Sequence, residues 1–79
     1  MTNLEKYNRI FKEIFEVGDD VLNGAFTFQA VDSWDSMRHL ALISELEDSF
    51  EIMFETDDIL HFGGYKNGID ILKRYGVKI

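Results

Sequence analysis

The sequence predicts an all-α fold, a small antiparallel four-helix bundle with three longer helices, one short helix and a long loop between the first and second helices. Apolar residues recur at helical spacing near the start, in the middle and at the end of the chain. Glycines and capping residues separate these stretches. By contrast, residues 19–35 show no sustained period, and a loop of this length in a small domain usually crosses between helices or carries function.

The first helix is expected to follow Thr2 and to end near Val17. Thr2 and Glu5 have the spacing of a capping box, in which each side chain bonds to the backbone N–H of the other residue. Gly18 suits the left-handed position after a helix, because glycine has no Cβ to clash there. The apolar residues at helical spacing are Leu4, Tyr7, Ile10, Phe11, Ile14 and Phe15.

Residues 19–35 are expected to form an ordered loop with apolar anchors. Val21-Leu22 and Phe26-Thr27-Phe28 supply these anchors. The second group alternates as a strand does, but one triplet without a pairing partner is too little to predict a sheet. Trp34 has two open roles, since it can pack the loop against the bundle or flank a group attached nearby.

An amphipathic helix from Trp34 to Phe50 is the centre of the predicted fold. Its inward face consists of Leu42, Ile43, Leu46 and Phe50, and its outward face of Met37, Ala41, Ser44 and Asp48. Ser36 falls in the first turn, where backbone N–H groups lack intrahelical acceptors and the helix dipole favours anions. A phosphate bonded to Ser36 would therefore lie in a favourable field.

Two further helices are expected after residue 50. Thr56 suits an N-cap, the acidic residues after it suit a first turn, and this short helix should run through Leu60 or His61. Gly63-Gly64 interrupts the pattern, and Asn67 can cap again. The last helix carries its apolar residues at helical spacing and ends at Gly76. These residues are Ile69, Ile71, Leu72 and Tyr75.

Composition limits the possible functions of the chain. The 79 residues predict one domain, 1–79, which is too small to enclose an active site, so we expect a protein that is not an enzyme. The chain has no Cys and no apolar run of about 20 residues, which favours a cytoplasmic protein without a membrane span. We also expect it to be a monomer. A net charge of −7 argues against nucleic acid and anionic lipid as partners, and no stretch has the spacing of a calcium loop.

The middle of the chain resembles the acyl carrier proteins. Asp35-Ser36-Met37, followed by Leu40, Ile43, Leu46, Glu47 and Phe50, is similar to the Asp-Ser-Leu motif that opens the second helix of that four-helix family. The resemblance covers nearly the whole chain. It implies that 4'-phosphopantetheine is esterified to Ser36 beside the motif residue Asp35, and that its thiol holds acyl groups as thioesters for fatty acid or secondary metabolite biosynthesis.

The resemblance also implies a set of partners. A Mg²⁺-dependent phosphopantetheinyl transferase would transfer the arm from coenzyme A, and acyl-activating and acyl-transferring enzymes with basic patches would dock on an acidic face. That predicted docking surface consists of Met37, Ala41, Glu45, Glu47, Asp48, Asp57 and Asp58. Two alternatives remain open: an aminoacyl carrier of the D-alanyl or peptidyl type, and an unmodified acidic helical module that binds a basic protein surface.

A catalytic interpretation of the same residues is disfavoured. Asp35, Ser36 and His39 include the residue types of a nucleophilic triad. The acid of a triad must orient the imidazole from the side away from the serine, which is difficult for an aspartate adjacent to that serine. We therefore expect His39 to be a hydrogen-bonded, partly buried histidine.

Overall fold

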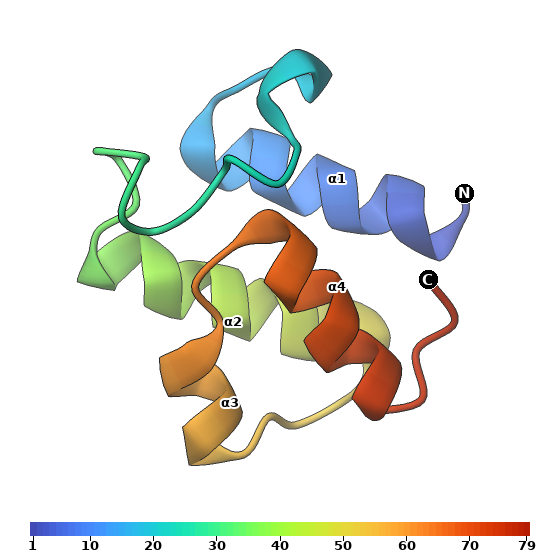
Figure 1. Cartoon of the computed structure of the whole chain (residues 1–79). Coiled ribbons are helices and arrows are strands. Elements are labelled where there is room, and N and C mark those ends of the chain that lie inside the picture. The colour runs from blue at the N-terminus through green and yellow to red at the C-terminus, as the bar shows by residue number, and fades with distance from the viewer.

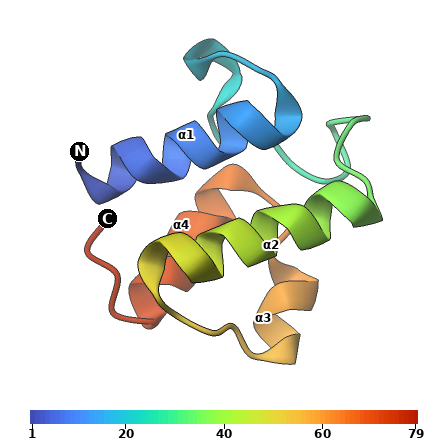
Figure 2. The same ribbon diagram turned by 180° about the vertical axis from the view of Figure 1, so that it is seen from behind.

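The computed structural model describes residues 1–79 and contains helices and loops but no strands (Figure 1). The four α-helices are α1 (Asn3–Phe15), α2 (Ser36–Phe50), α3 (Thr56–His61) and α4 (Tyr65–Arg74), and a 3-10 turn spans Asp19–Val21. Helices α1 and α2 lie side by side and run in opposite directions (Figures 1 and 2). This arrangement confirms the predicted small helical bundle. None of the helices combines the length and apolar character that crossing a membrane requires.

The predicted capping box starts α1, but Glu16 rather than Gly18 ends it. The Thr2 Oγ1 accepts a hydrogen bond from the Glu5 N–H at 3.1 Å, and Glu5 Oε1 accepts from the Thr2 N–H at 2.8 Å. Glu16 takes the left-handed conformation with φ of 55°, whereas Gly18 is extended. This early turn directs Val17 onto the core, with its N–H donating to the Lys12 carbonyl at 3.3 Å.

The starts of α2 and α3 differ from the prediction by one or two residues. Helix α2 begins at Ser36 rather than at Trp34, because Asp35 takes the N-cap position and its Oδ1 accepts from the Arg38 N–H at 2.8 Å. Glu55, not Thr56, precedes α3, and no side chain caps that helix.

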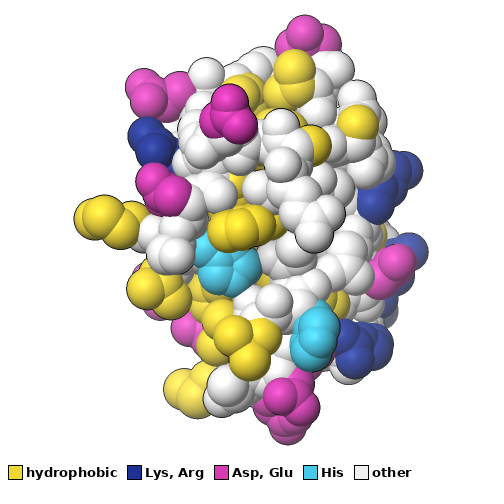
Figure 3. All heavy atoms as spheres, turned by 60° about the vertical axis from the view of Figure 1, so that its left-hand side comes forward, with side chains coloured by type: hydrophobic (Ala, Val, Ile, Leu, Met, Phe, Trp, Pro, Cys, Tyr) yellow, Lys and Arg dark blue, Asp and Glu magenta, His cyan; other side chains and the backbone are white.

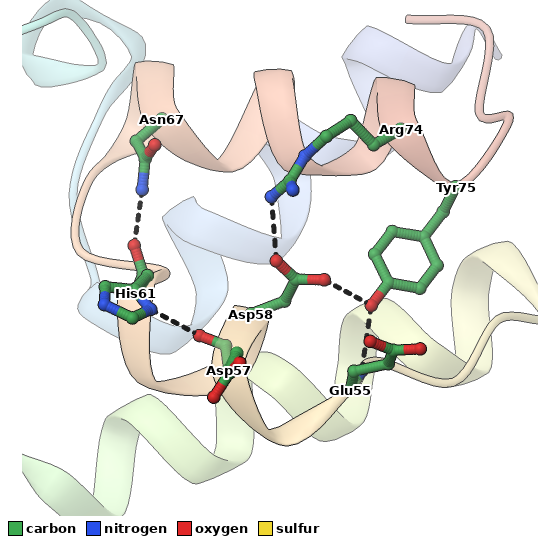
Figure 4. A network of polar contacts seen from close by, with 7 residues as sticks. All are labelled: Glu55, Asp57, Asp58, His61, Asn67, Arg74 and Tyr75. Carbon is green, nitrogen blue, oxygen red and sulfur yellow. Dashed lines mark hydrogen bonds and ion pairs between the residues drawn. The ribbon is translucent and has the colours of Figure 1, made fainter.

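Asn67 does not cap α4, which already begins at Tyr65 after Gly64. The Tyr65 N–H donates to the Phe26 carbonyl at 2.9 Å, so the loop satisfies one N–H at the start of this helix. The Asn67 amide instead donates to the His61 carbonyl at 2.5 Å (Figure 4). At the other end, Gly76 adopts a positive φ of 86° just after the helix, close to where the sequence predicted the end.

Aromatic side chains join the long loop to the bundle. Trp34 is 2 % exposed, and its ring centroid lies 5.0 Å from that of Phe15 and 5.8 Å from those of Phe11 and Phe26. Of its two open roles, Trp34 therefore takes the packing of the loop against α1. The core residues are Tyr7, Ile10, Phe11, Phe15, Phe26, Trp34, Leu42, Ile43, Leu46, Phe54, Phe62, Tyr65, Ile71 and Leu72.

The loop is also bonded to the connection between α3 and α4. The Phe28 N–H donates to the Gly63 carbonyl at 2.9 Å, next to the bond between Tyr65 and Phe26. Thr27 and Gly64 form one isolated antiparallel bridge. The prediction of an ordered loop without a strand is therefore correct, and the bridge places the loop beside the start of α4.

A polar network joins α3 to the end of α4 (Figure 4). The Asp58 carboxylate accepts from Arg74 Nη2 at 2.7 Å and from the Tyr75 hydroxyl at 2.5 Å. The Tyr75 hydroxyl in turn accepts from the Glu55 N–H at 2.8 Å. The hydrogen bond from Tyr75, followed by that from Arg74, holds the pKa of Asp58 below its ordinary value, and the bond to Asp58 raises the pKa of Tyr75.

We expect Asp58→Asn to lower the melting temperature at neutral pH and to weaken the dependence of stability on acid. A carboxyl whose pKa is lower in the folded state stabilises the fold above its unfolded pKa, and this contribution is lost as the pH falls through the folded pKa. The difference from wild type should therefore shrink as the pH drops below the ordinary value of 3.8. Circular-dichroism melting curves across the acid range measure this difference.

Asp57→Asn is the matched control for this experiment, since Asp57 occupies the same first turn of α3 without an ion pair. Asp57→Asn should lower the melting temperature at neutral pH much less than Asp58→Asn does. If the melting temperature of Asp58→Asn stays below that of wild type by the same amount down to strongly acidic pH, the ionised Asp58 carboxylate does not stabilise the fold.

Candidate functional site

Ser36 is the first residue of α2, and its side chain is exposed. Its hydroxyl makes no hydrogen bond within the chain, while the preceding Asp35 caps the helix through the Arg38 N–H. Arg38 is anchored in turn, because its Nε donates to the Ile14 carbonyl of α1 at 3.3 Å. The helix start is thus held in place by its neighbours, and the serine hydroxyl stays accessible.

Ser36 lies on the rim of a cleft with a volume of about 820 Å³. The loop, α2, α3 and the start of α4 all contribute to its walls. Its apolar lining residues are Phe28, Leu40, Ile59, Leu60 and Phe62. Ligand-binding clefts of small molecules commonly have volumes of roughly 300 to 1,000 Å³ and mainly apolar walls, so this cleft has room for a small organic group.

His39 lines the same cleft and links three parts of the fold. The Trp34 indole Nε1 donates to His39 Nδ1 at 3.1 Å, and His39 Nε2 lies 2.8 Å from the Ile59 carbonyl oxygen. An indole N–H can only donate, so Nδ1 is the acceptor and Nε2 carries the proton that Ile59 accepts. The prediction of a hydrogen-bonded, partly buried histidine is confirmed. With both nitrogens engaged and Asp35 capping α2, these residues are not arranged as a triad.

The acidic residues of the predicted docking surface fall into two groups. Glu47 is half-buried and its Oε2 accepts from the Phe54 N–H at 2.9 Å, which holds the connection between α2 and α3. Asp58 belongs to the network with Arg74 and Tyr75. The exposed carboxylates without such contacts are those of Glu45, Asp48 and Asp57.

Apolar side chains are exposed on α2 and α3. Met37 and Ala41 are exposed as predicted, and the exposed fraction of Met37 is 82 %. Figure 3 shows hydrophobic side chains beside the two histidines of the chain on the face that includes the cleft. Leu40 and Leu60, at 63 % and 72 % exposed, belong both to this group and to the cleft lining.

Sequence reasoning missed most of the cleft. Leu40 follows Ser36 by one helical turn, so helical spacing could have placed it beside the serine. Phe28, Leu60 and Phe62 come from other segments, and no local pattern indicates that they meet there.

Comparison of the chain with protein-family models, with curated proteins and with solved structures gives no match. The function must therefore be inferred from the site itself. Its main features are an exposed serine at a helix start, an apolar cleft beside that serine and exposed carboxylates further along the same helix.

Proposed function

We propose that this chain is an acyl carrier protein, with 4'-phosphopantetheine esterified to the Ser36 hydroxyl and acyl groups held as thioesters on the arm. The observation that carries the proposal is the unbonded Ser36 side chain in the first turn of α2, at the rim of an apolar cleft. A transferase needs an accessible hydroxyl, and a carrier needs a place where an apolar cargo can avoid water. Both requirements meet at this helix start.

The arm has to be covalently attached on energetic grounds. A helix N-terminus contributes about 0.3 to 1 kcal/mol towards an anion, whereas retention at micromolar concentration needs about 8 kcal/mol. An ester bond to Ser36 removes this requirement, and the weak favourable field then orients only the phosphate. The chain itself supplies no base, because the transferase activates the hydroxyl and provides coenzyme A.

The cleft gives a carrier a reversible shelter for its cargo. Burial of one methylene group stabilises by roughly 0.8 kcal/mol, so an acyl chain against the exposed side chains of Phe28 and Leu40 would be held by a few kcal/mol. Association of that strength is readily reversed, and a partner enzyme can draw the cargo out. Two exposed side chains, Met37 next to Ser36 in α2 and Leu60 in the cleft lining, offer such an enzyme an apolar contact.

We expect incubation with coenzyme A, Mg²⁺ and a broad-specificity phosphopantetheinyl transferase to add one phosphopantetheinyl group to the protein. Intact mass spectrometry measures the addition, and fragment spectra locate it. Ser36→Ala should gain nothing, because the acceptor oxygen is gone.

Ser44→Ala is the matched control, since Ser44 is an exposed serine further along the same helix. It should be modified as wild type is. A wild-type mass that does not change, or a Ser36→Ala variant that still gains the group, overturns the proposal.

The exposed acidic residues support the proposal that a partner docks here with a basic surface. Reversing the charges of Glu45 and Asp48 should lower kcat/KM for the transferase by up to about tenfold at low salt, since complementary charges mainly speed encounter. The loss should fade as salt rises, because the screening length shortens to about 8 Å at 0.15 M. Steady-state kinetics over a salt series measures both effects. Equal rates for variant and wild type at every salt concentration would show that this face does not dock.

The second candidate function is an unmodified acidic module, which the free carboxylates of Glu45, Asp48 and Asp57 favour. Such a module would show the same salt-sensitive binding without gaining an arm. The mass measurement therefore separates the two functions.

A further inference from the structure

The cleft beside Ser36 has an unusual charge for this chain. The protein has 15 acidic residues and 8 basic ones, yet none of the 14 residues that line the cleft is acidic. Lys66 is the one lysine or arginine among them. The cleft is therefore a carboxylate-free, cationic region in an acidic protein.

The Lys66 ammonium group has no partner within the protein. It takes part in no ion pair or hydrogen bond, whereas Arg74 of the same helix is paired with Asp58. A Cβ added to Gly24 would lie 3.7 Å from Lys66 Cγ, so the lysine stem runs along the loop. The aliphatic part of a lysine side chain can pack along a surface in this way while its ammonium group stays free.

Three other polar side chains of the cleft are already engaged, and the remaining two, Gln29 and Ser36, are uncharged. Both nitrogens of His39 are bonded, to Trp34 and to Ile59. The Asn67 amide donates to the His61 carbonyl, and the Thr27 hydroxyl accepts from the Ala30 N–H at 3.2 Å. Lys66 is thus the free cationic group that can meet an anionic ligand.

Ser36 and Lys66 enter the cleft from different helices. Ser36 is the first residue of α2, and Lys66 lies in the first turn of α4. The starts of these two helices are apart in both ribbon views (Figures 1 and 2). The exposed apolar side chains of Phe28 and Leu40 line the same cleft. A chain that enters beside Ser36 can therefore pass apolar walls and meet a cation.

We propose that the cargo is an acyl group with a carboxylate at the end remote from the thioester, and that Lys66 binds this carboxylate within the cleft. This inference rests on the proposed carrier function. The apolar part of such a cargo matches the apolar walls, and its charge matches Lys66. An aminoacyl cargo fits less well, because its ammonium group would find no carboxylate among the residues that line the cleft.

The test compares two cargoes of equal chain length on the full chain. Octanoyl-coenzyme A and suberyl-coenzyme A, which ends in a carboxylate, are each loaded by the transferase, and intact mass confirms loading. The rate at which hydroxylamine cleaves each thioester is then measured, since cargo held in the cleft is protected. Lys66→Met removes the cation and keeps the stem, and Lys73→Met is the control, since Lys73 is an exposed lysine of α4 outside the cleft.

Lys66→Met should speed cleavage of the suberyl thioester by about two- to fivefold, the range expected for one solvent-accessible ion pair, and leave the octanoyl rate unchanged. Lys73→Met should change neither rate. If Lys66→Met alters both cargoes alike or neither, or if an aminoacyl cargo is the protected one, the inference is wrong while the carrier function stands. If no cargo can be loaded because the protein accepts no arm, the carrier function fails and the inference fails with it.

Discussion

Replacing Trp34 with alanine should lower the free energy of unfolding by about 3 to 5 kcal/mol, the usual cost of removing a large buried aromatic side chain. Trp34 is 2 % exposed and contacts rings from α1 and from the loop, including Phe15 and Phe26. Its indole N–H also donates to His39 at 3.1 Å. One substitution therefore opens a cavity and detaches the loop that forms a wall of the cleft.

This loss should be a large part of the total stability, since the free energy of unfolding of native proteins is about 5 to 15 kcal/mol. Urea denaturation followed by circular dichroism measures it, because the chain has one Trp and the variant loses its fluorescence. A partial replacement separates the contribution of the buried ring from that of the hydrogen bond to His39. Trp34→Phe keeps a ring in the core but leaves His39 Nδ1 without its donor, so its loss should be smaller than that of Trp34→Ala.

These variants also have consequences for the site. His39 and Phe28 line the cleft, and the Trp34 ring contacts both. Amide chemical shifts of Phe28 and Ile59 should therefore change in Trp34→Phe. A Trp34→Ala variant that loses less than about 1 kcal/mol would show that the loop is held without this side chain.

Gly68→Ala should be the second severe substitution. A Cβ at this position would overlap the Phe62 Cζ and the Tyr7 hydroxyl, and it would lie 2.6 Å from Phe62 Cε1. In an exposed helix, alanine would be more stable than glycine by roughly 1 kcal/mol. Here the overlap dominates, because neither neighbour can withdraw from the closely packed core.

The Tyr7 side chain has little freedom to move. It is fully buried, its hydroxyl donates to the Tyr65 carbonyl at 2.7 Å, and burial raises its pKa above the ordinary value. Displacing it would leave a buried polar group without its partner. We therefore expect a net loss of about 1 to 3 kcal/mol, which lowers the melting temperature by about 4 to 8 °C for each kcal/mol in a domain of this size.

Gly63→Ala is the matched control, since a Cβ there meets nothing closer than the His61 carbonyl oxygen at 3.9 Å. Its melting temperature should stay near that of wild type. Gly68→Ala with an unchanged or higher melting temperature would contradict the close packing of α4 against α1.

Features that depend on neighbouring residues in the sequence were largely predictable. The capping box of Thr2 and Glu5 forms as expected, because its hydrogen bonds need only one helical turn. The predicted inward face of α2 was also correct, since Leu42, Ile43 and Leu46 are buried and Phe50 is partly buried against the core. Helical periodicity alone determines which side chains share a face. The exposed position of Ser36 at a helix start follows from the same local rules.

Helix ends were less predictable where distant segments compete for them. Gly18 was the better left-handed residue by propensity, yet Glu16 takes that conformation because Val17 then packs on the core. Asn67 was the better cap, yet α4 starts after Gly64, where the loop carbonyl of Phe26 accepts the Tyr65 N–H. In both cases a tertiary contact outweighs a preference of a few tenths of a kcal/mol to about 1 kcal/mol.

By itself the sequence determined the four helices, the ordered loop and the serine at the start of α2, because hydrogen bonds and side-chain periodicity within a few residues specify them. Only the tertiary structure decided that Asp58 is bound by Arg74 and Tyr75. It also decided that a carboxylate-free cleft with Lys66 in its wall opens beside Ser36. These features join residues that are far apart in the chain, and their positions depend on how the helices pack.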